Sequence, residues 1–326
     1  RKFLKTSILY RKIIPLLILL CIAASLLNSS AFGSDSLIAL FFYSILAALL
    51  AVSIFISFLL SKKSFSFTLP LYLILFLLLS LYVLVHGILN NNIRLTHYYW
   101  ITNAIFIVSI HYWVTSQQVA QNFLETQSIR FTFKGIVALA LLESVIVLLQ
   151  CVKLFPVPNQ FFICTGTWSN PNVTAMFLAL SLFAVIKVKF NWGVKREWII
   201  NSILVIILIA IVALRSRSAY LAAGVILFSE FGFTNIKSFF LKNINASNKG
   251  TAFSVFTAII LIIITTSFIS KTDSTNNRIS IWKNTINLIV EKPLTGYGFG
   301  MFEKEYNLFA AEQQNISNEH INMAYN

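Results

Sequence analysis

The sequence is poor in charged residues. Only 11% of its 326 residues are charged, whereas 57% are hydrophobic, 30 are phenylalanine and the mean hydropathy is +0.79. A soluble domain carries roughly a quarter of charged residues, so this composition excludes a soluble globular protein. Apolar stretches of about 20 residues, long enough to cross a bilayer, recur along the chain.

We therefore expect an all-α polytopic membrane protein with about nine transmembrane helices. The predicted spans lie near residues 13–28, 37–60, 69–89, 98–115, 135–151, 173–186, 198–214, 218–233 and 252–270. They form a transmembrane domain over residues 1–270, which an extracytoplasmic segment follows over residues 271–326. Because that segment stops at Asn326 without returning to the membrane, the sequence predicts that it is truncated at its C-terminal end.

Cysteine and histidine are also rare, with three and four residues. Cys21, Cys151 and Cys164 lack the spacing of metal ligands, and the histidines do not cluster with carboxylates. The sequence therefore supports no metal site, and we expect no cofactor. Cys151 and Cys164 would form a disulfide only in an oxidising compartment, and we expect free thiols.

Lysine and arginine are unevenly distributed between alternate loops. If the N-terminus is cytoplasmic, sixteen of these residues fall in cytoplasmic loops and four in the opposite short loops. This positive-inside bias predicts a cytoplasmic N-terminus and places the final segment outside. The net charge of +14 then reflects topology and anionic lipid headgroups, not nucleic-acid binding.

Two of the basic residues on the outer side, Arg215 and Arg217, lie where one predicted span ends and the next begins almost at once. Arginine at a membrane edge often anchors a helix by reaching to the interface. Two arginines at one tight turn also suit a phosphate-rich substrate, because guanidinium groups form bidentate hydrogen bonds with phosphate. The sequence leaves both interpretations open.

A short amphipathic helix is predicted to begin at Arg278 and to break at Pro293. Trp282, Ile286 and Ile289 recur at helical spacing and form an apolar stripe, which would lie on the membrane surface or on the bundle. A helix N-terminus attracts anions, so Arg278 and this helix end would share a phosphate. The alternative is a surface arginine stacked on Trp282.

Three glycines at alternate positions, Gly296, Gly298 and Gly300, follow this helix. They do not form a dinucleotide fingerprint, because no strand precedes them and they face away from cytoplasmic nucleotides. We expect them to allow turns with positive φ.

Three other polar residues are candidates for a structural or functional role. Glu143, in the middle of the fifth span, should face the bundle interior, where it either lines a cavity or bonds a neighbouring helix. Asn172 is a candidate cap for the following span. His320 is the only histidine in the final segment, and it is either a solvated loop residue or a general base.

Three stretches together resemble the O-antigen ligase and polymerase superfamily of bacterial envelope glycosyltransferases. They are Gly166-Thr-Trp-Ser-Asn-Pro-Asn172, Ser216-Arg-Ser-Ala219, and a segment that runs from Arg278-Ile-Ser-Ile-Trp282 to Pro293-Leu-Thr-Gly-Tyr-Gly-Phe-Gly-Met-Phe302. The resemblance covers about the second half of the chain.

The resemblance implies an enzyme of the inner membrane that moves a glycan from undecaprenyl diphosphate to an acceptor hydroxyl on the periplasmic face. The acceptor would be lipid A–core, another glycan or a protein serine, so the chain is expected to act as a ligase, a polymerase or a protein O-oligosaccharyltransferase in lipopolysaccharide or other polysaccharide biosynthesis.

The resemblance also implies roles for individual residues. Arg217 and Arg278, with Arg215 beside them, would bind the donor diphosphate. Family members carry a histidine, often within Ala-His-Asn, that is thought to activate the acceptor. Here the corresponding residues read Ala324-Tyr325-Asn326, so Tyr325 takes the histidine position and His320 is the available substitute.

A membrane transporter or flippase is the alternative from a different class. Such proteins commonly contain inverted repeats and paired charges inside their spans. The sequence has no internal repeat, and Glu143 is its one clear mid-span charge, so the sequence favours the enzyme.

Overall fold

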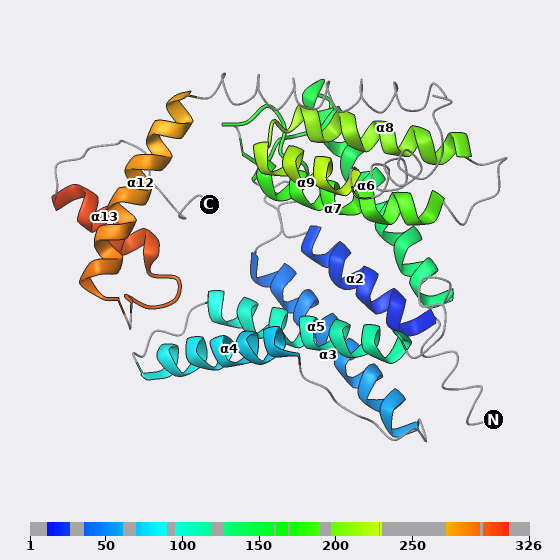
Figure 1. The fold of residues 1–326 in the computed structure, drawn as a ribbon, viewed down its shortest axis with the longest axis horizontal. Coiled ribbons are helices and arrows are strands. Elements are labelled where there is room, and N and C mark those ends of the chain that lie inside the picture. The colour runs from blue at the N-terminus through cyan, green and yellow to red at the C-terminus, as the bar shows by residue number, and fades with distance from the viewer. Residues whose placement is uncertain are drawn as a thin grey trace, which may run out of the picture. The chain divides into compact units, whose positions relative to one another are not determined.

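The computed structural model describes residues 12–26, 36–60, 70–89, 95–118, 127–159, 161–168, 170–189, 197–227, 229, 272–293 and 296–312. In these residues every regular element is a helix and there is no strand, which confirms the predicted all-α class (Figure 1). The chain divides into two compact units. One contains residues 1–62 and 109–268, and the other contains residues 63–108 and 269–326.

Eight of the described helices lie where the sequence predicts spans: α2 (Ile14–Leu26), α3 (Ser36–Leu60), α4 (Leu71–Leu89), α5 (Leu95–Gln118), α6 (Gln127–Cys151), α7 (Pro171–Lys189), α8 (Glu197–Ala213) and α9 (Arg217–Leu227). Within the described residues, three helices are both long and apolar enough to cross a membrane: Leu71–Leu89, Gln127–Cys151 and Pro171–Val188. The predicted span over residues 252–270 lies outside the described residues, so the number nine stays a prediction.

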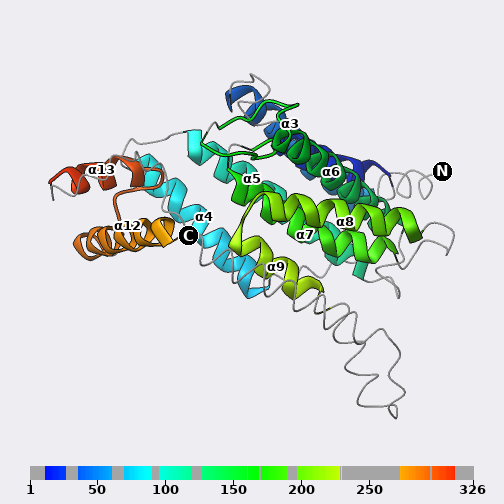
Figure 2. The same ribbon diagram turned by 90° about the horizontal axis from the view of Figure 1, so that it is seen from above.

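The first unit is built around α6 and α7. Helix α6 packs against α2, α7 and α8, and α7 also packs against α8 and α9. Helices α7 and α8 lie side by side in both ribbon views (Figures 1 and 2).

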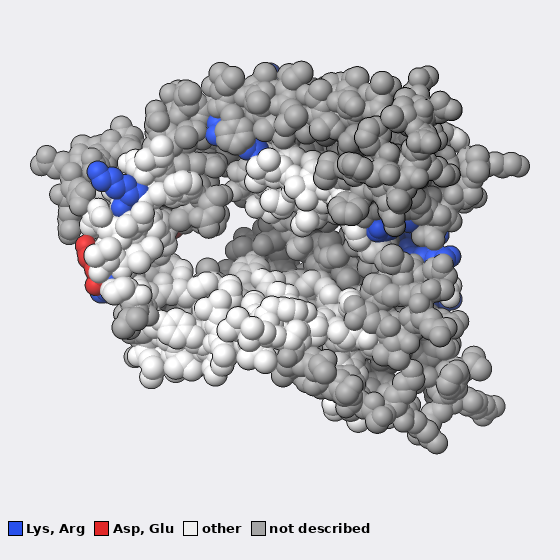
Figure 3. Space-filling model, in the orientation of Figure 1, with Lys and Arg blue, Asp and Glu red and all other residues white. Residues whose placement is uncertain are grey.

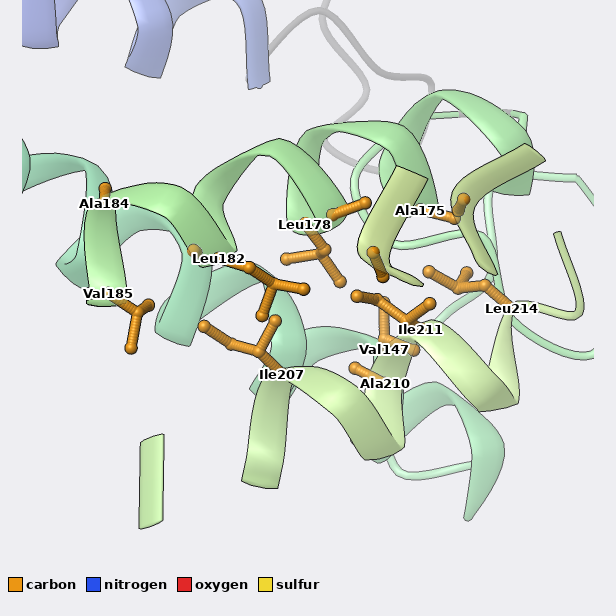
Figure 4. Packing of buried hydrophobic residues seen from close by; sticks show 14 of the residues in the cluster. Val147, Ala175, Leu178, Leu182, Ala184, Val185, Ile207, Ala210, Ile211 and Leu214 are labelled. Atoms are coloured by element: carbon orange, nitrogen blue, oxygen red, sulfur yellow. The ribbon is translucent and has the colours of Figure 1, made fainter. Parts of the chain in front are cut away.

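The core of this unit lies between α7 and α8. Leu178 and Leu182 of α7 point toward Ile207 and Ile211 of α8, and all four side chains are buried (Figure 4). Alanines also line this core. Small side chains let helices in a membrane approach closely, and the resulting van der Waals contacts stabilise the bundle. The fully buried alanines of this core are Ala140, Ala175, Ala179, Ala210 and Ala219.

The start of α7 differs from the prediction by two residues. Asn170, and not Asn172, caps this helix: the Asn170 Oδ1 accepts a hydrogen bond of 2.9 Å from the Asn172 N–H. The reason is Pro171, which lacks an N–H and has a fixed φ, and is therefore suited to the first helical position. The cap must then precede the proline.

The second unit contains α4, the first half of α5, α12 (Thr272–Glu291) and α13 (Phe302–Glu312). Helix α12 ends two residues before Pro293, as predicted. Gly296, Gly298 and Gly300 have φ values of 59°, 107° and 77°, which confirms that these glycines serve turns with positive φ.

The exposed surface of the described residues is largely apolar. Helix α4 exposes leucine along most of its length, including Leu71, Leu75, Leu78 and Leu89. Figure 3 shows that few charged side chains interrupt the described surface on the face that it views. An apolar exterior of this kind is suited to lipid, and the protein is a multi-pass membrane protein.

Candidate functional site

The two predicted arginines lie at the sharp reversal between α8 and α9. Helix α8 ends at Ala213 and α9 begins at Arg217, so Leu214, Arg215 and Ser216 make the whole connection. Arg215 has a φ of 52°, a left-handed conformation that is uncommon for any residue but glycine. The Arg215 side chain is exposed, and that of Arg217 is half-buried.

Several hydrogen bonds fix this reversal. The Arg215 N–H donates to the Val212 carbonyl oxygen at 3.1 Å, and the Tyr220 hydroxyl donates to the same oxygen at 3.0 Å. Ser216 is 1% exposed, and its hydroxyl lies 3.2 Å from that of Ser218. Both helices therefore hold the segment that carries the arginines.

The loop between α6 and α7 meets the same reversal. The Cys164 thiol donates to the Ala213 carbonyl oxygen at 3.5 Å, which joins the loop to the last residue of α8. Burial and the neighbouring Cys151 raise the pKa of the Cys164 thiol to about 12, while the positive charge of Arg215 lowers it. All three cysteines are free thiols, as expected.

Gln150, near the end of α6, bonds this loop at four points. Its amide nitrogen donates to the carbonyl oxygens of Pro156 and Gly166, both at 2.9 Å. Its amide oxygen accepts from the backbone N–H groups of Thr165 at 3.0 Å and Gly166 at 2.8 Å. Gln150 was not predicted from the sequence; the available signal was a polar side chain seven positions, or two helical turns, after Glu143 in a largely apolar span.

Glu143 faces the bundle interior, as predicted, and is 1% exposed. Its Oε1 accepts hydrogen bonds from the Thr167 N–H at 2.7 Å and from the Thr167 hydroxyl at 3.2 Å. The partner is therefore the α6–α7 loop, and not a neighbouring helix, which was one of the two alternatives that the sequence left open. The loop folds back into the bundle because Gly166, with a φ of 74°, lets the backbone come close to the carboxylate.

Arg278 does not open its helix, so the prediction that the helix begins at this residue is wrong. Helix α12 begins at Thr272, which places Arg278 in the second turn, about 9 Å along the axis from the first residue. The helix extends that far because neither proline nor glycine lies between these two residues. The side chain of Arg278 lies outside the described residues, as do His320 and Tyr325.

The predicted apolar stripe of α12 is exposed. Trp282, Ile286 and Ile289 are 48%, 59% and 56% exposed. A different face of α12, with Ile281 and Leu288, packs against Tyr306 of α13 and the residues around it. The contact of the stripe with the membrane surface stays a prediction.

The glycine-rich turn after α12 packs against α4 and α5 in the same unit. A Cβ on Gly298 would lie 3.2 Å from the His86 ring. The Phe299 ring lies 5.4 Å from both the His97 and the Trp100 rings, in edge-to-face geometry. Among the described residues, no group of three His, Cys, Asp or Glu side chains is placed to hold a metal ion.

Comparison with known proteins identifies the family. A family model for O-antigen ligase matches residues 161–326, which contain the second part of the α6–α7 loop, the Arg215 and Arg217 reversal, α12 and α13. Comparison with curated proteins and with solved structures gives no match. Members of the matched family are glycosyltransferase-like enzymes, ligases and polymerases. The chain belongs to the O-antigen ligase family.

Proposed function

We propose that this protein is a ligase-type glycosyltransferase of the bacterial inner membrane. It moves a glycan from undecaprenyl diphosphate to an acceptor hydroxyl, such as one of lipid A–core, on the periplasmic face. Arg217, Arg215 and Arg278 bind the donor diphosphate, and His320, or a residue near Tyr325, takes the proton of the acceptor.

The reversal between α8 and α9 is the observation that supports this proposal best. It places two guanidinium groups two residues apart, on a segment that three hydrogen bonds hold to its neighbours. Arginine pairs of this kind bind phosphate oxygens with defined geometry, and a fixed support keeps them in place during the reaction. The reversal also lies within the residues that the family model matches.

The chemistry requires charge stabilisation more than anything else. The acceptor oxygen attacks the anomeric carbon, the bond from that carbon to the diphosphate oxygen breaks, and the bonding electrons leave with the diphosphate. The acceptor proton passes to the base. Because arginines close to the leaving oxygen neutralise the charge that develops there, the proposed reaction needs no metal ion.

A polymerase and a protein O-oligosaccharyltransferase use the same donor chemistry and differ only in the acceptor, so they remain alternatives. A transporter or flippase is the alternative from a different class. Glu143, which a transporter would use inside its pathway, instead accepts two hydrogen bonds from Thr167. This contact gives the mid-span charge a role in holding a loop, and it supports the enzyme.

Deletion of the gene, followed by gel analysis of surface polysaccharide, tests the proposal. We expect lipid-linked polymer to accumulate without transfer to core. Single repeats on core would indicate a polymerase instead, and an unchanged glycan profile with loss of solute uptake would contradict the enzyme.

Complementation with single variants then tests the residues. We expect Arg217→Ala and Arg278→Ala to lower transfer at least about 100-fold, because removal of one charge-stabilising donor commonly has this effect. Arg217→Lys should restore only part of it, since an ammonium lacks the planar fork. Arg130→Ala is the matched arginine control, because Arg130 lies near the start of α6, at the end of this helix that is far from the α6–α7 loop. The Arg130→Ala variant should transfer glycan at the parent rate. Full activity in Arg278→Ala would contradict the proposed diphosphate clamp.

The base is tested separately with His320→Ala and Tyr325→Phe, since the two positions are alternatives. Loss of transfer in only one of these variants, with normal membrane insertion, identifies the residue.

A further inference from the structure

We propose that Glu143 and Gln150 of α6 are positioning residues for the donor site, acting through the α6–α7 loop on the reversal that carries Arg215 and Arg217. This inference rests on the proposed function. Neither residue lies in the part of the chain that the family model matches, residues 161–326, although both bind loop residues inside it.

Gln150 uses its full hydrogen-bonding capacity on the backbone of the α6–α7 loop. A glutamine amide has two donor hydrogens and one oxygen with two lone pairs, and all four are engaged. Gln150 is 1% exposed, and two of its partners are the N–H and the carbonyl of a single residue, Gly166. Such a network fixes both the position and the orientation of the loop backbone.

Glu143 lies two turns earlier on the same face of α6, about 10 Å along the axis. It binds the residue that follows Gly166, so α6 holds the loop at consecutive positions. There is no room for adjustment: a Cβ on Gly166 would lie 2.1 Å from the Glu143 Oε1 and 2.6 Å from the Thr174 methyl carbon. On the other side, the Thr174 hydroxyl of α7 donates to the Thr165 carbonyl.

A hydrogen bond links the part of the loop that α6 holds to the helix that precedes the arginines. Cys164, the neighbour of Thr165, donates to the Ala213 carbonyl oxygen. Ala213 is the last residue of α8, and Arg215 follows two residues later. A change in the loop therefore alters the support of the reversal without any change in the arginines themselves.

Packing alone does not require these two residues. Polar side chains inside a membrane bundle are costly, and apolar residues of similar size would fill the same space. Two other buried polar residues of α6 bond their own helix: the Ser144 hydroxyl donates to the Ala140 carbonyl and the Thr132 hydroxyl to the Ser128 carbonyl. Glu143 and Gln150 differ because their partners lie in the loop.

The test uses Gln150→Leu and Glu143→Leu in the full-length chain, with Ser144→Ala as the matched buried control. All are built in a Cys21→Ser/Cys151→Ser background, so that Cys164 is the only thiol of the three. The first measurement is the rate of Cys164 alkylation by N-ethylmaleimide. The second is kcat and KM with polyprenyl-diphosphate-linked oligosaccharide extracted from cells that lack the gene.

Both leucine variants are expected to alkylate at least about tenfold faster, because Cys164 is 3% exposed only while the loop is held. Their kcat should fall about 30- to 100-fold, the range expected when reacting groups are misplaced by about 1 Å. KM should change by less than about threefold, since the lipid tail and glycan still bind. Ser144→Ala should resemble the parent in both measurements, and Glu143→Gln, whose amide oxygen still accepts from Thr167, should retain most of the kcat.

Unchanged kcat in the leucine variants would overturn the proposal, whether or not Cys164 becomes reactive. If the leucine variants fail to insert, Gln150→Glu replaces them: a carboxyl group keeps an accepting oxygen but donates at most one hydrogen bond, so at least one of the two donated bonds is lost. Normal kcat there is equally decisive against the proposal. Arg217→Ala is measured in parallel. Full activity in that variant contradicts the diphosphate clamp, whereas its inactivity beside a normal Gln150→Leu contradicts only the positioning role.

Discussion

Replacement of Gly166 by alanine should strongly destabilise the α6–α7 loop. Gly166 has a φ of 74°, and the new Cβ would lie 2.1 Å from the Glu143 Oε1 and 2.6 Å from the Thr174 Cγ2. These atoms belong to two different helices, and the Glu143 oxygen already accepts two hydrogen bonds. The loop must therefore move away and lose those bonds.

Three contributions set the magnitude. The left-handed conformation costs alanine about 1 kcal/mol, the overlap about 1–3 kcal/mol, and a buried acceptor left without its donors about 1–3 kcal/mol. We expect a loss of about 3–7 kcal/mol in the free energy of unfolding.

Gly296→Ala is the matched control, because it isolates the backbone contribution. Gly296 has a φ of 59°, and no atom lies within 4 Å of a Cβ added there. Its replacement should cost only about 1 kcal/mol.

The assay is equilibrium unfolding of the purified protein in mixed detergent micelles, with both variants and the parent measured under the same conditions. An equal loss in Gly166→Ala and Gly296→Ala would refute the reasoning, because it would show that the contacts of the loop with Glu143 and Thr174 contribute nothing.

Three further predictions concern other parts of the chain. Arg215→Gly should be about 1 kcal/mol more stable than Arg215→Ala in the same unfolding assay, because only glycine adopts a φ of 52° without strain; both variants should lose transfer activity. Ile281→Ala should cost about 2–4 kcal/mol, since Ile281 is 4% exposed beside Tyr306, whereas Trp282→Ala should change unfolding much less because Trp282 is 48% exposed. Folding raises the pKa of the Cys164 thiol from 9.0 to about 12, so the unfolded chain releases this proton at a lower pH than the folded chain. The contribution of the protonated thiol to the free energy of unfolding is therefore fully present below pH 9 and should be lost as the pH rises from 9 to 12. Comparison of the parent with Cys164→Ala over this range measures it.

Local rules of the chain account for the features that the sequence predicted well. The apolar runs predicted helices, and eight of them lie where expected. Pro293 marked the end of α12, and the glycines after it marked turns with positive φ, since proline blocks a helix and glycine alone tolerates such turns easily. Three stretches together, around Asn170, Arg217 and Arg278, predicted the family, which the match over residues 161–326 confirms.

The first residue of α7 and the buried face of α12 were not predicted from the sequence. The first depends on the neighbouring Pro171, a local signal, whereas the second depends on a separate helix. Asn170 and Asn172 are both good caps, and α7 begins after the first because Pro171 occupies the first helical position. Two apolar faces compete on α12, and the face with Ile281 is buried because α13 supplies Tyr306 to pack on it.

The amino-acid sequence by itself determined that this protein is helical, lies in a membrane and carries two arginines at a tight turn, because each of these follows from residues close together in the chain. Tertiary structure alone decided what supports those arginines. Gln150 and Glu143 lie 6 to 24 residues before their partners, and only the fold of the α6–α7 loop back into the bundle brings them together. A hydrogen bond across that separation has no periodic pattern in the sequence, since its donor and acceptor meet only after the helices have packed.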